Sequence, residues 1–156
     1  MKGDVVGTAK DAQDPQHQNR LGMKKGRWLS INFGIWWDGD LLRELLDHET
    51  VTKYNWEKKS IDIVKRFEDI RFNNGTKSNP CLAADILGDW REEVMARSED
   101  SSELRIYTTT IPTDYRINCL MSDIPYRLSV ATQNVGYNQP SEPGYYIGPD
   151  NQDYLK

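Results

Sequence analysis

The sequence predicts an all-β fold made of antiparallel β-propeller blades. From Trp28 onward, short apolar or alternating runs are separated by turn signals such as Asp-Gly, Gly-Asp and Asn-Gly. An internal repeat has the spacing expected of successive propeller blades. About two blades fit into the length that is available.

The expected strands follow one another along the chain. They are SINFGIWW (30–37), LLRELLD (41–47), TVTKYNW (50–56), SIDIVKRF (60–67), CLAADIL (81–87), REEVMAR (91–97), ELRIYTTTI (103–111) and YRLSVATQ (126–133). LLRELLD and REEVMAR could also be helical, but LLRELLD is too short for an independent helix and lies between two strong strand candidates. We therefore expect a strand there, and leave INCLMSDI (117–124) undecided.

The repeat has the pattern G-D-x-x-x-E-[LV]. It begins at Gly39 and again at Gly88, an offset of 49 residues (88 minus 39). A period of about 40–50 residues with four strands is typical of propeller blades. Because a propeller usually closes with about four to eight blades, two blades would leave apolar faces uncovered. A fragment of a larger protein is the simplest expectation; a different sandwich and closure by oligomerisation are the alternatives.

Composition excludes several classes of protein. With 20 Lys and Arg against 24 Asp and Glu, the net charge is -4, which argues against nucleic-acid binding through bulk positive charge. Mean hydropathy is -0.76, and no run approaches the roughly 20 apolar residues of a membrane span. The chain begins without a signal-peptide pattern. Aromatic residues make up 10% of the sequence, too many for a typical disordered segment.

Five segments together resemble one family: SINFGIWWDGDLLRELLD, NNGTKSNPCLAADILGDWREEV, ELRIYTTTIPT, YRLSVATQNVGYNQP and GYYIG. From about Ser30 to Gly148 the chain resembles the C-terminal part of the rhamnogalacturonan lyases of polysaccharide lyase family 11. The resemblance implies an eight-bladed propeller, bound calcium, and cleavage of the rhamnogalacturonan I backbone of pectin by β-elimination. It implies an extracellular or periplasmic parent enzyme, whose N-terminal blades would be the partner of this chain.

The resemblance also sets domain boundaries. Residues 28–149 would form the blades, 150–156 a tail, and 1–27 a loosely matching strand and polar loop. A non-catalytic carbohydrate-binding or interaction remnant of such a lyase is the alternative function.

From its residues alone, the loop Asn74-Gly75-Thr76-Lys77 is predicted to be a solvated turn before a strand. The resemblance implies instead that Asn74, Gly75 and Thr76 bind sugar and that Lys77 is catalytic. Elimination requires a base for the acidic C5 proton of galacturonate and a cation beside the developing enediolate; a lysine can fill either role. Tyr137, in NVGYNQP, would stack on the sugar or protonate the leaving oxygen.

The two repeats supply the candidate metal ligands, Asp38, Asp40 and Glu44 in the first and Asp85, Asp89 and Glu93 in the second. Calcium prefers carboxylate and carbonyl oxygens gathered by tight turns, and the resemblance favours structural calcium here. The alternative is ordinary hairpin chemistry, in which Glu44 and Glu93 pair with Arg43 and Arg91.

Overall fold

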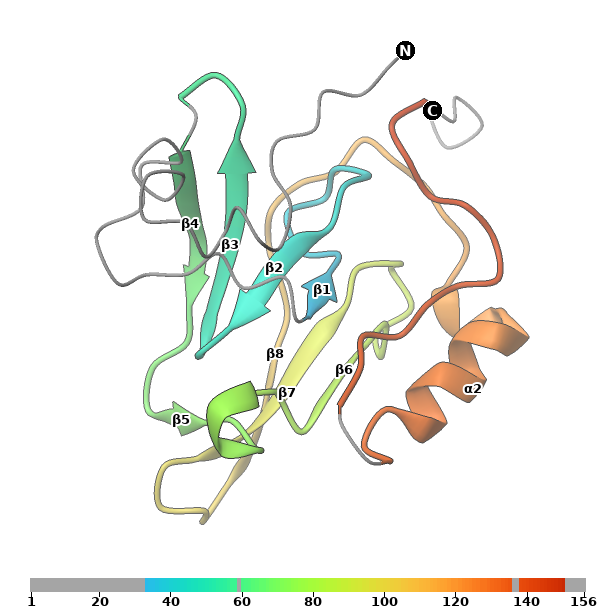
Figure 1. The fold of residues 1–156 in the computed structure, drawn as a ribbon. Coiled ribbons are helices and arrows are strands. Elements are labelled where there is room, and N and C mark those ends of the chain that lie inside the picture. Colours follow the sequence, from blue (N-terminus) through green and yellow to red (C-terminus); the bar gives the residue numbers. More distant parts are fainter. Residues whose placement is uncertain (1–32, 59, 136–137, 151–156) are drawn as a thin grey trace.

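A computed structural model describes residues 33–58, 60–135 and 138–150 of the 156-residue chain (Figure 1). Within these ranges the chain is mostly β, with two four-stranded antiparallel sheets and one α-helix. The N-terminal segment 1–27, Tyr137 and all but the first residue of the tail 150–156 lie outside the described residues.

The first sheet is a meander in which each strand pairs with the next. Its strands are β1 (Gly34–Ile35), β2 (Glu44–Asp47), β3 (Thr50–Asn55) and β4 (Ser60–Arg66). His48 and Glu49 form the two-residue turn between β2 and β3, with φ angles of 44° and 56°. Positive φ at both turn residues gives the hairpin twist that matches the twist of the strands. The strand predicted over 41–47 begins only at Glu44, because residues 38–42 form the repeated turn.

The second sheet is organised around its central strand, β7 (Glu93–Ser98). One edge of β7 pairs with β8 (Leu104–Tyr107). The other edge pairs first with β5 (Ile70–Arg71) and then with β6 (Leu82–Ala84). Ile70 pairs with Ser98, so an unbroken strand would bring residue 73 opposite Met95; Leu82 lies there instead, nine residues later (82 minus 73). The chain therefore leaves this edge and rejoins it after a nine-residue insertion.

The main core lies between the two sheets. Side chains that alternate along the strands point to this interior from both sides, as the period of two in a strand requires. It comprises Phe33, Ile35, Trp37, Leu46, Val51, Phe67, Ile70, Phe72, Ala83, Val94 and Ala96. Burying these large apolar side chains is the dominant favourable contribution to folding.

The strand predicted over 126–133 is wrong, because this segment belongs to helix α2 (Ile124–Thr132). Asp123 caps the helix by accepting a hydrogen bond from the Tyr126 N–H at 3.1 Å, and Pro125 stands in the first turn, where its missing N–H has no consequence. The undecided segment 117–124 contains a 3-10 helix over Leu120–Ser122. Tyr126 and Val130 of α2 pack with Trp36, Leu41, Trp90 and Leu120 in a second core.

Candidate functional site

The loop with the sequence Asn74-Gly75-Thr76-Lys77 lies on the nine-residue insertion between β5 and β6. Asn73 and Asn79 close its base by exchanging two backbone hydrogen bonds, of 2.7 and 3.1 Å. Gly75–Lys77 form a 3-10 helix, flanked by Asn74 and Ser78 with φ angles of 63° and 45°. Non-glycine residues in this left-handed region are strained, and such strain is concentrated at functional sites. A pinched, strained loop therefore projects from the edge of a rigid sheet.

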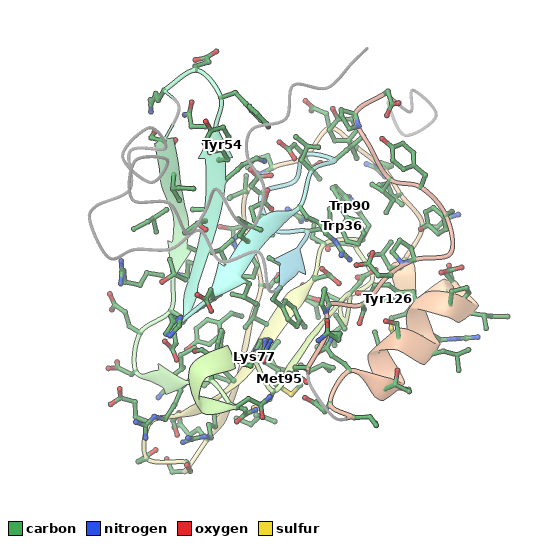
Figure 2. The ribbon with its side chains drawn as sticks, in the orientation of Figure 1. Trp36, Tyr54, Lys77, Trp90, Met95 and Tyr126 are labelled. Carbon is green, nitrogen blue, oxygen red and sulfur yellow. The ribbon has the colours of Figure 1, made fainter. Side chains whose placement is uncertain are left out.

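The predicted residues of this loop differ from one another in their position relative to a neighbouring cavity. Asn74 and Gly75 line a cavity beside the loop, whereas Lys77 is exposed and does not line it. In the view of Figure 2, Lys77 is drawn close to Met95 of β7. The backbone of Thr76 belongs to the 3-10 helix.

Tyr137 lies outside the described residues, but the segments around it are tied to the same region. Asn138 is buried and donates its Nδ2 hydrogen to the Pro80 carbonyl at 2.8 Å. The Asn134 Nδ2 donates to the Cys81 carbonyl at 2.6 Å. Residues on both sides of Tyr137 are thus attached to the end of the insertion that carries Lys77.

Side-chain amides also cover the free edge of β6, a feature that the sequence analysis missed. Gln133 is buried and binds Ala83 twice: its Oε1 accepts from the Ala83 N–H, and its Nε2 donates to the Ala83 carbonyl, both at 2.8 Å. The amide of Gln133 thereby replaces the hydrogen bonds of a neighbouring strand. The run of amide residues in TQNVGYNQ was the available signal.

The repeated turns are the same structure in both copies. In the first turn, Glu44 Oε2 accepts from the N–H groups of Trp37 and Asp38, at 2.8 and 3.0 Å. Glu93 Oε2 accepts from Ile86 and Leu87 at the same two distances. Both glutamates are buried, and burial raises the pKa of each carboxyl group. The repeated glutamate therefore satisfies the backbone of its own turn, and neither Glu44 nor Glu93 pairs with the neighbouring arginine.

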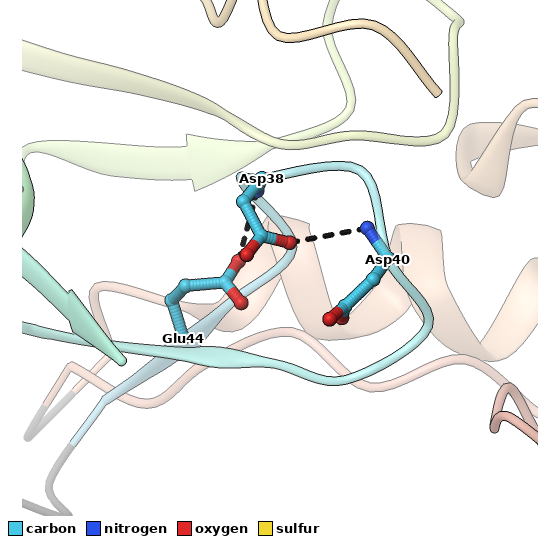
Figure 3. A group of neighbouring side chains, drawn as sticks. All are labelled: Asp38, Asp40 and Glu44. Atoms are coloured by element: carbon cyan, nitrogen blue, oxygen red, sulfur yellow. Dashed lines mark hydrogen bonds between the residues drawn. The ribbon is translucent and has the colours of Figure 1, made fainter. Parts of the chain in front are cut away.

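Asp38, Asp40 and Glu44 of the first turn lie together and form a group that could hold a metal ion (Figure 3). The ammonium group of Lys53, on β3, contacts all three. Its Nζ lies 2.5 Å from Asp38 Oδ2, 2.5 Å from Asp40 Oδ2 and 2.9 Å from Glu44 Oε1. Burial lowers the pKa of Lys53, but hydrogen bonds to the three carboxylates outweigh it and hold the pKa above its usual value.

The second turn does not bring its three predicted ligands together within the described ranges. Asp85 accepts from the N–H groups of Gly88 and Leu120, both at 2.7 Å, and Asp89 pairs with Arg91 at 2.5 Å. Thr108 takes the place of Lys53: its Oγ1 donates to Glu93 Oε1 at 3.1 Å. The carboxylates of this turn are therefore occupied by donors from the protein.

A buried carboxylate joins the two sheets to α2. Glu92 accepts from the Trp36 N–H at 3.0 Å and from the Tyr126 hydroxyl at 2.7 Å. Complete burial raises the pKa of Glu92 to about 7. Figure 2 shows Trp36 and Trp90 side by side above Tyr126. These tryptophans are packing residues of the second core.

Comparison with known proteins extends over almost the whole chain. Residues 8–155 match the family described as "Rhamnogalacturonan lyase family 11, C-terminal domain". Rhamnogalacturonan endolyase YesW of Bacillus subtilis is 54% identical over 119 residues, which are 76% of this chain and 19% of YesW. Rhamnogalacturonan exolyase YesX of the same organism is 49% identical over 127 residues, covering 76% of this chain and 21% of YesX.

Solved structures of such enzymes share the fold. A crystal structure of YesW superimposes with a TM-score of 0.76 at 51% identity, covering 83% of this chain and 23% of that one. The Bacillus licheniformis rhamnogalacturonan lyase PL11 gives 0.77 at 55% identity, with the same coverage. The chain thus spans about a fifth of the length of these relatives. No helix in the described ranges is long and apolar enough to cross a membrane.

Proposed function

The chain belongs to rhamnogalacturonan lyase family 11, to its C-terminal domain, and from this membership we propose that it is the C-terminal portion of an enzyme that cleaves the rhamnogalacturonan I backbone of pectin by β-elimination. The observation that carries the proposal is the family match over residues 8–155. The named activities of YesW and YesX support the substrate.

In this proposal Lys77 takes the C5 proton of galacturonate or stabilises the enediolate that develops. Tyr137 orients the sugar ring or protonates the leaving oxygen, and Asn74, Gly75 and Thr76 hold the sugar. The exposed position of Lys77 on a loop pinched at its base supports this role, because catalysis requires a group held in place by a rigid frame. The bonds from Asn134 and Asn138 to the same insertion support a shared site for Lys77 and Tyr137.

The two sheets, within residues 28–149, would be about two blades of an eight-bladed propeller whose remaining blades complete the active site. The likeness to a solved lyase supports this arrangement. We place the parent enzyme outside the cell or in the periplasm, where its pectic substrate is found.

We assign calcium to the first turn rather than to the second. Three carboxylates supply the hard oxygen ligands that calcium prefers, but Lys53 lies against all of them, so the ion must displace its ammonium group. Calcium at Asp85, Asp89 and Glu93 stays a prediction from the sequence.

A chimera tests the catalytic proposal. This chain replaces the matching C-terminal segment of YesW, and unsaturated product from rhamnogalacturonan I is followed by ultraviolet absorbance. We expect Lys77→Ala to reduce turnover at least about a hundredfold, the lower range for loss of a general base. Tyr137→Phe separates stacking, which survives, from proton donation, which does not.

Lys65→Ala, on the exposed face of β4, is the matched control and should leave turnover unchanged. A Lys77→Ala chimera with normal turnover would exclude Lys77 from catalysis. An inactive wild-type chimera that folds and still binds the polysaccharide would favour the non-catalytic carbohydrate-binding alternative.

A further inference from the structure

A cavity of about 620 Å³ adjoins the insertion, and Lys77 is not among the residues that line it. It is bounded by the β2–β3 turn, by β5 and the start of the insertion, and by the end of β7. The polar residues that line it are His48, Glu49, Arg71, Asn73, Asn74, Ser78, Arg97 and Glu99. Because Asn74 and Gly75 belong to this wall, the cavity adjoins the loop proposed to bind sugar.

Two of its residues form an unfavourable pair. Arg71 of β5 and Arg97 of β7 are direct cross-strand partners. Partners in an antiparallel pair have Cβ atoms about 5 Å apart, and like charges placed opposite one another destabilise the sheet. Among the residues described, neither guanidinium forms an ion pair with a carboxylate. The sheet thus presents two guanidinium groups without an ion-pair partner to one cavity, whose lining also contains the side chains of Glu49 and Glu99.

The other ionisable residues around the cavity are His48, Glu49 and Glu99. Glu49 is half-buried and its Oε1 accepts from the Phe72 N–H at 3.1 Å, which fixes it to the start of the insertion. His48 Nδ1 lies 2.8 Å from Asp47. Glu99 is exposed at the rim, and its backbone carbonyl accepts from Arg97 at 3.5 Å. Arg97 also donates to the Ser101 hydroxyl at 2.8 Å, which holds its side chain in place.

We propose that Arg71 and Arg97 form a clamp for the carboxylate of a second galacturonate unit of the polysaccharide, other than the unit at Lys77. A guanidinium group binds a carboxylate through two parallel hydrogen bonds, and an anion between the arginines removes their mutual repulsion. This second galacturonate unit differs from the unit at Lys77, because Lys77 does not line the cavity. The identity of the acidic sugar rests on the proposed function; the clamp itself rests on the sheet register and the cavity.

Calorimetric titration of the 156-residue chain with a rhamnogalacturonan I oligosaccharide tests the clamp. We expect Arg71→Gln and Arg97→Gln each to weaken binding about tenfold or more, and lysine at either position to restore it in part. The same oligosaccharide with its carboxylates reduced to alcohols should bind the wild type as weakly as the variants bind the native sugar. Arg127→Gln, which removes an exposed positive charge on α2, is the matched control and should bind normally.

A second measurement needs no ligand. Removing one arginine relieves the repulsion, so each glutamine variant should melt at a higher temperature than the Arg127→Gln control. The clamp is overturned by unchanged affinity in both glutamine variants, by equal binding of the carboxyl-reduced sugar, or by absence of oligosaccharide binding. The glutamine variants could instead lower the melting temperature of the YesW chimera and leave its KM unchanged. That result would show that the arginines pair with carboxylates of the protein and not with the sugar.

Failure of the clamp and failure of the lyase proposal have different signatures. An active chimera whose KM is insensitive to Arg71→Gln and Arg97→Gln refutes the clamp alone. An inactive chimera whose sugar binding still depends on both arginines and on the carboxylates refutes the lyase activity and leaves the clamp intact.

Discussion

Lys53 and Thr108 occupy the same place in two copies of one turn, and they differ in charge. Each donates to the buried glutamate of its turn, at 2.9 Å to Glu44 and 3.1 Å to Glu93. Only the first turn has two further carboxylates within reach, those of Asp38 and Asp40, so only there does a cation balance the site. The charge of the donor therefore follows the number of carboxylates around it.

Lys53→Met should destabilise the chain by about 3 kcal/mol, because buried Glu44 loses its counter-ion. Added calcium should then raise the melting temperature of the variant more than that of the wild type, since no ammonium group competes for the ligands. Thermal melts with calcium and with EDTA measure both effects. Lys58→Met, which removes an exposed lysine 3.8 Å from Asp62, is the control. Equal calcium responses in variant and wild type would exclude a metal from the first turn.

Glu92 should make stability depend on pH. Burial raises its pKa from 4.5 to about 7, so the folded chain holds a proton that the unfolded chain has released between these values. Stability should therefore fall as the pH rises from about 4.5 to about 7 and then level off. Glu92→Gln should flatten this slope; its denaturation midpoints from pH 5 to 8 provide the measurement. If the denaturation midpoint of the variant fell with rising pH as steeply as that of the wild type, the pH dependence would be assigned to Glu44, whose pKa is also raised by burial.

At the scale of elements, β6 depends on a helix end rather than on another strand. Gln133→Ala leaves the N–H and the carbonyl of Ala83 without their partners. We expect a loss of about 3 kcal/mol in the free energy of unfolding, measured by urea denaturation. Gln139→Ala, an exposed amide in the same segment, should change it by less than about 0.5 kcal/mol. Similar losses in the two variants would mean that Gln133 does not support the edge of β6.

The strands could be predicted where turn signals and alternating apolar residues occurred together. The helix α2 could not be predicted in this way. β3, β4 and β8 lie within predicted runs, and β7 extends one residue beyond its run, because each combines β-prone residues with a turn signal at its end. The run YRLSVATQ has the same appearance, but Asp123 and Pro125 just before it are helix-start signals, and the segment is helical.

The site was predictable only in part, for a similar reason. The Asp-Gly turns predicted the gathering of Asp38, Asp40 and Glu44. The contact of Lys53 with this turn could not be predicted from the sequence. Lys53 lies on β3, and the pairing of β3 with β2 brings its side chain to the turn. The Arg71 and Arg97 pair likewise depends on the register of β5 against β7, two strands whose paired residues lie 26 positions apart in the sequence (97 minus 71).

Considered as a whole, the molecule leaves one face of its second sheet uncovered. Val94 and Tyr107 point to the core, so their neighbours Met95 and Ile106 point to the opposite face, where Leu104 and Ile106 are 60% and 53% exposed. Among the described strands β8 pairs only with β7, so its outer edge is open as well. Exposed apolar side chains on β8, beside its open edge, favour association with another sheet.

The isolated chain should therefore self-associate, and Ile106→Lys should shift it toward the monomer. Size-exclusion chromatography across a concentration series measures this change. Leu87→Lys is the matched control, because Leu87 is 64% exposed in a turn away from this face. A wild-type chain that elutes as a cooperatively melting monomer at every concentration would contradict the role of the face.

The insertion between β5 and β6 has a consequence for how such a sheet can evolve. Both strands keep their register with β7, and Asn73 and Asn79 seal the base of the loop, so residues 74–78 carry none of the pairing of the sheet. Changes in the exposed part of this loop leave the strand pairing intact, so the loop and the sheet can vary separately. A lineage can thus inherit the scaffold unchanged and diversify the loop proposed to bind sugar.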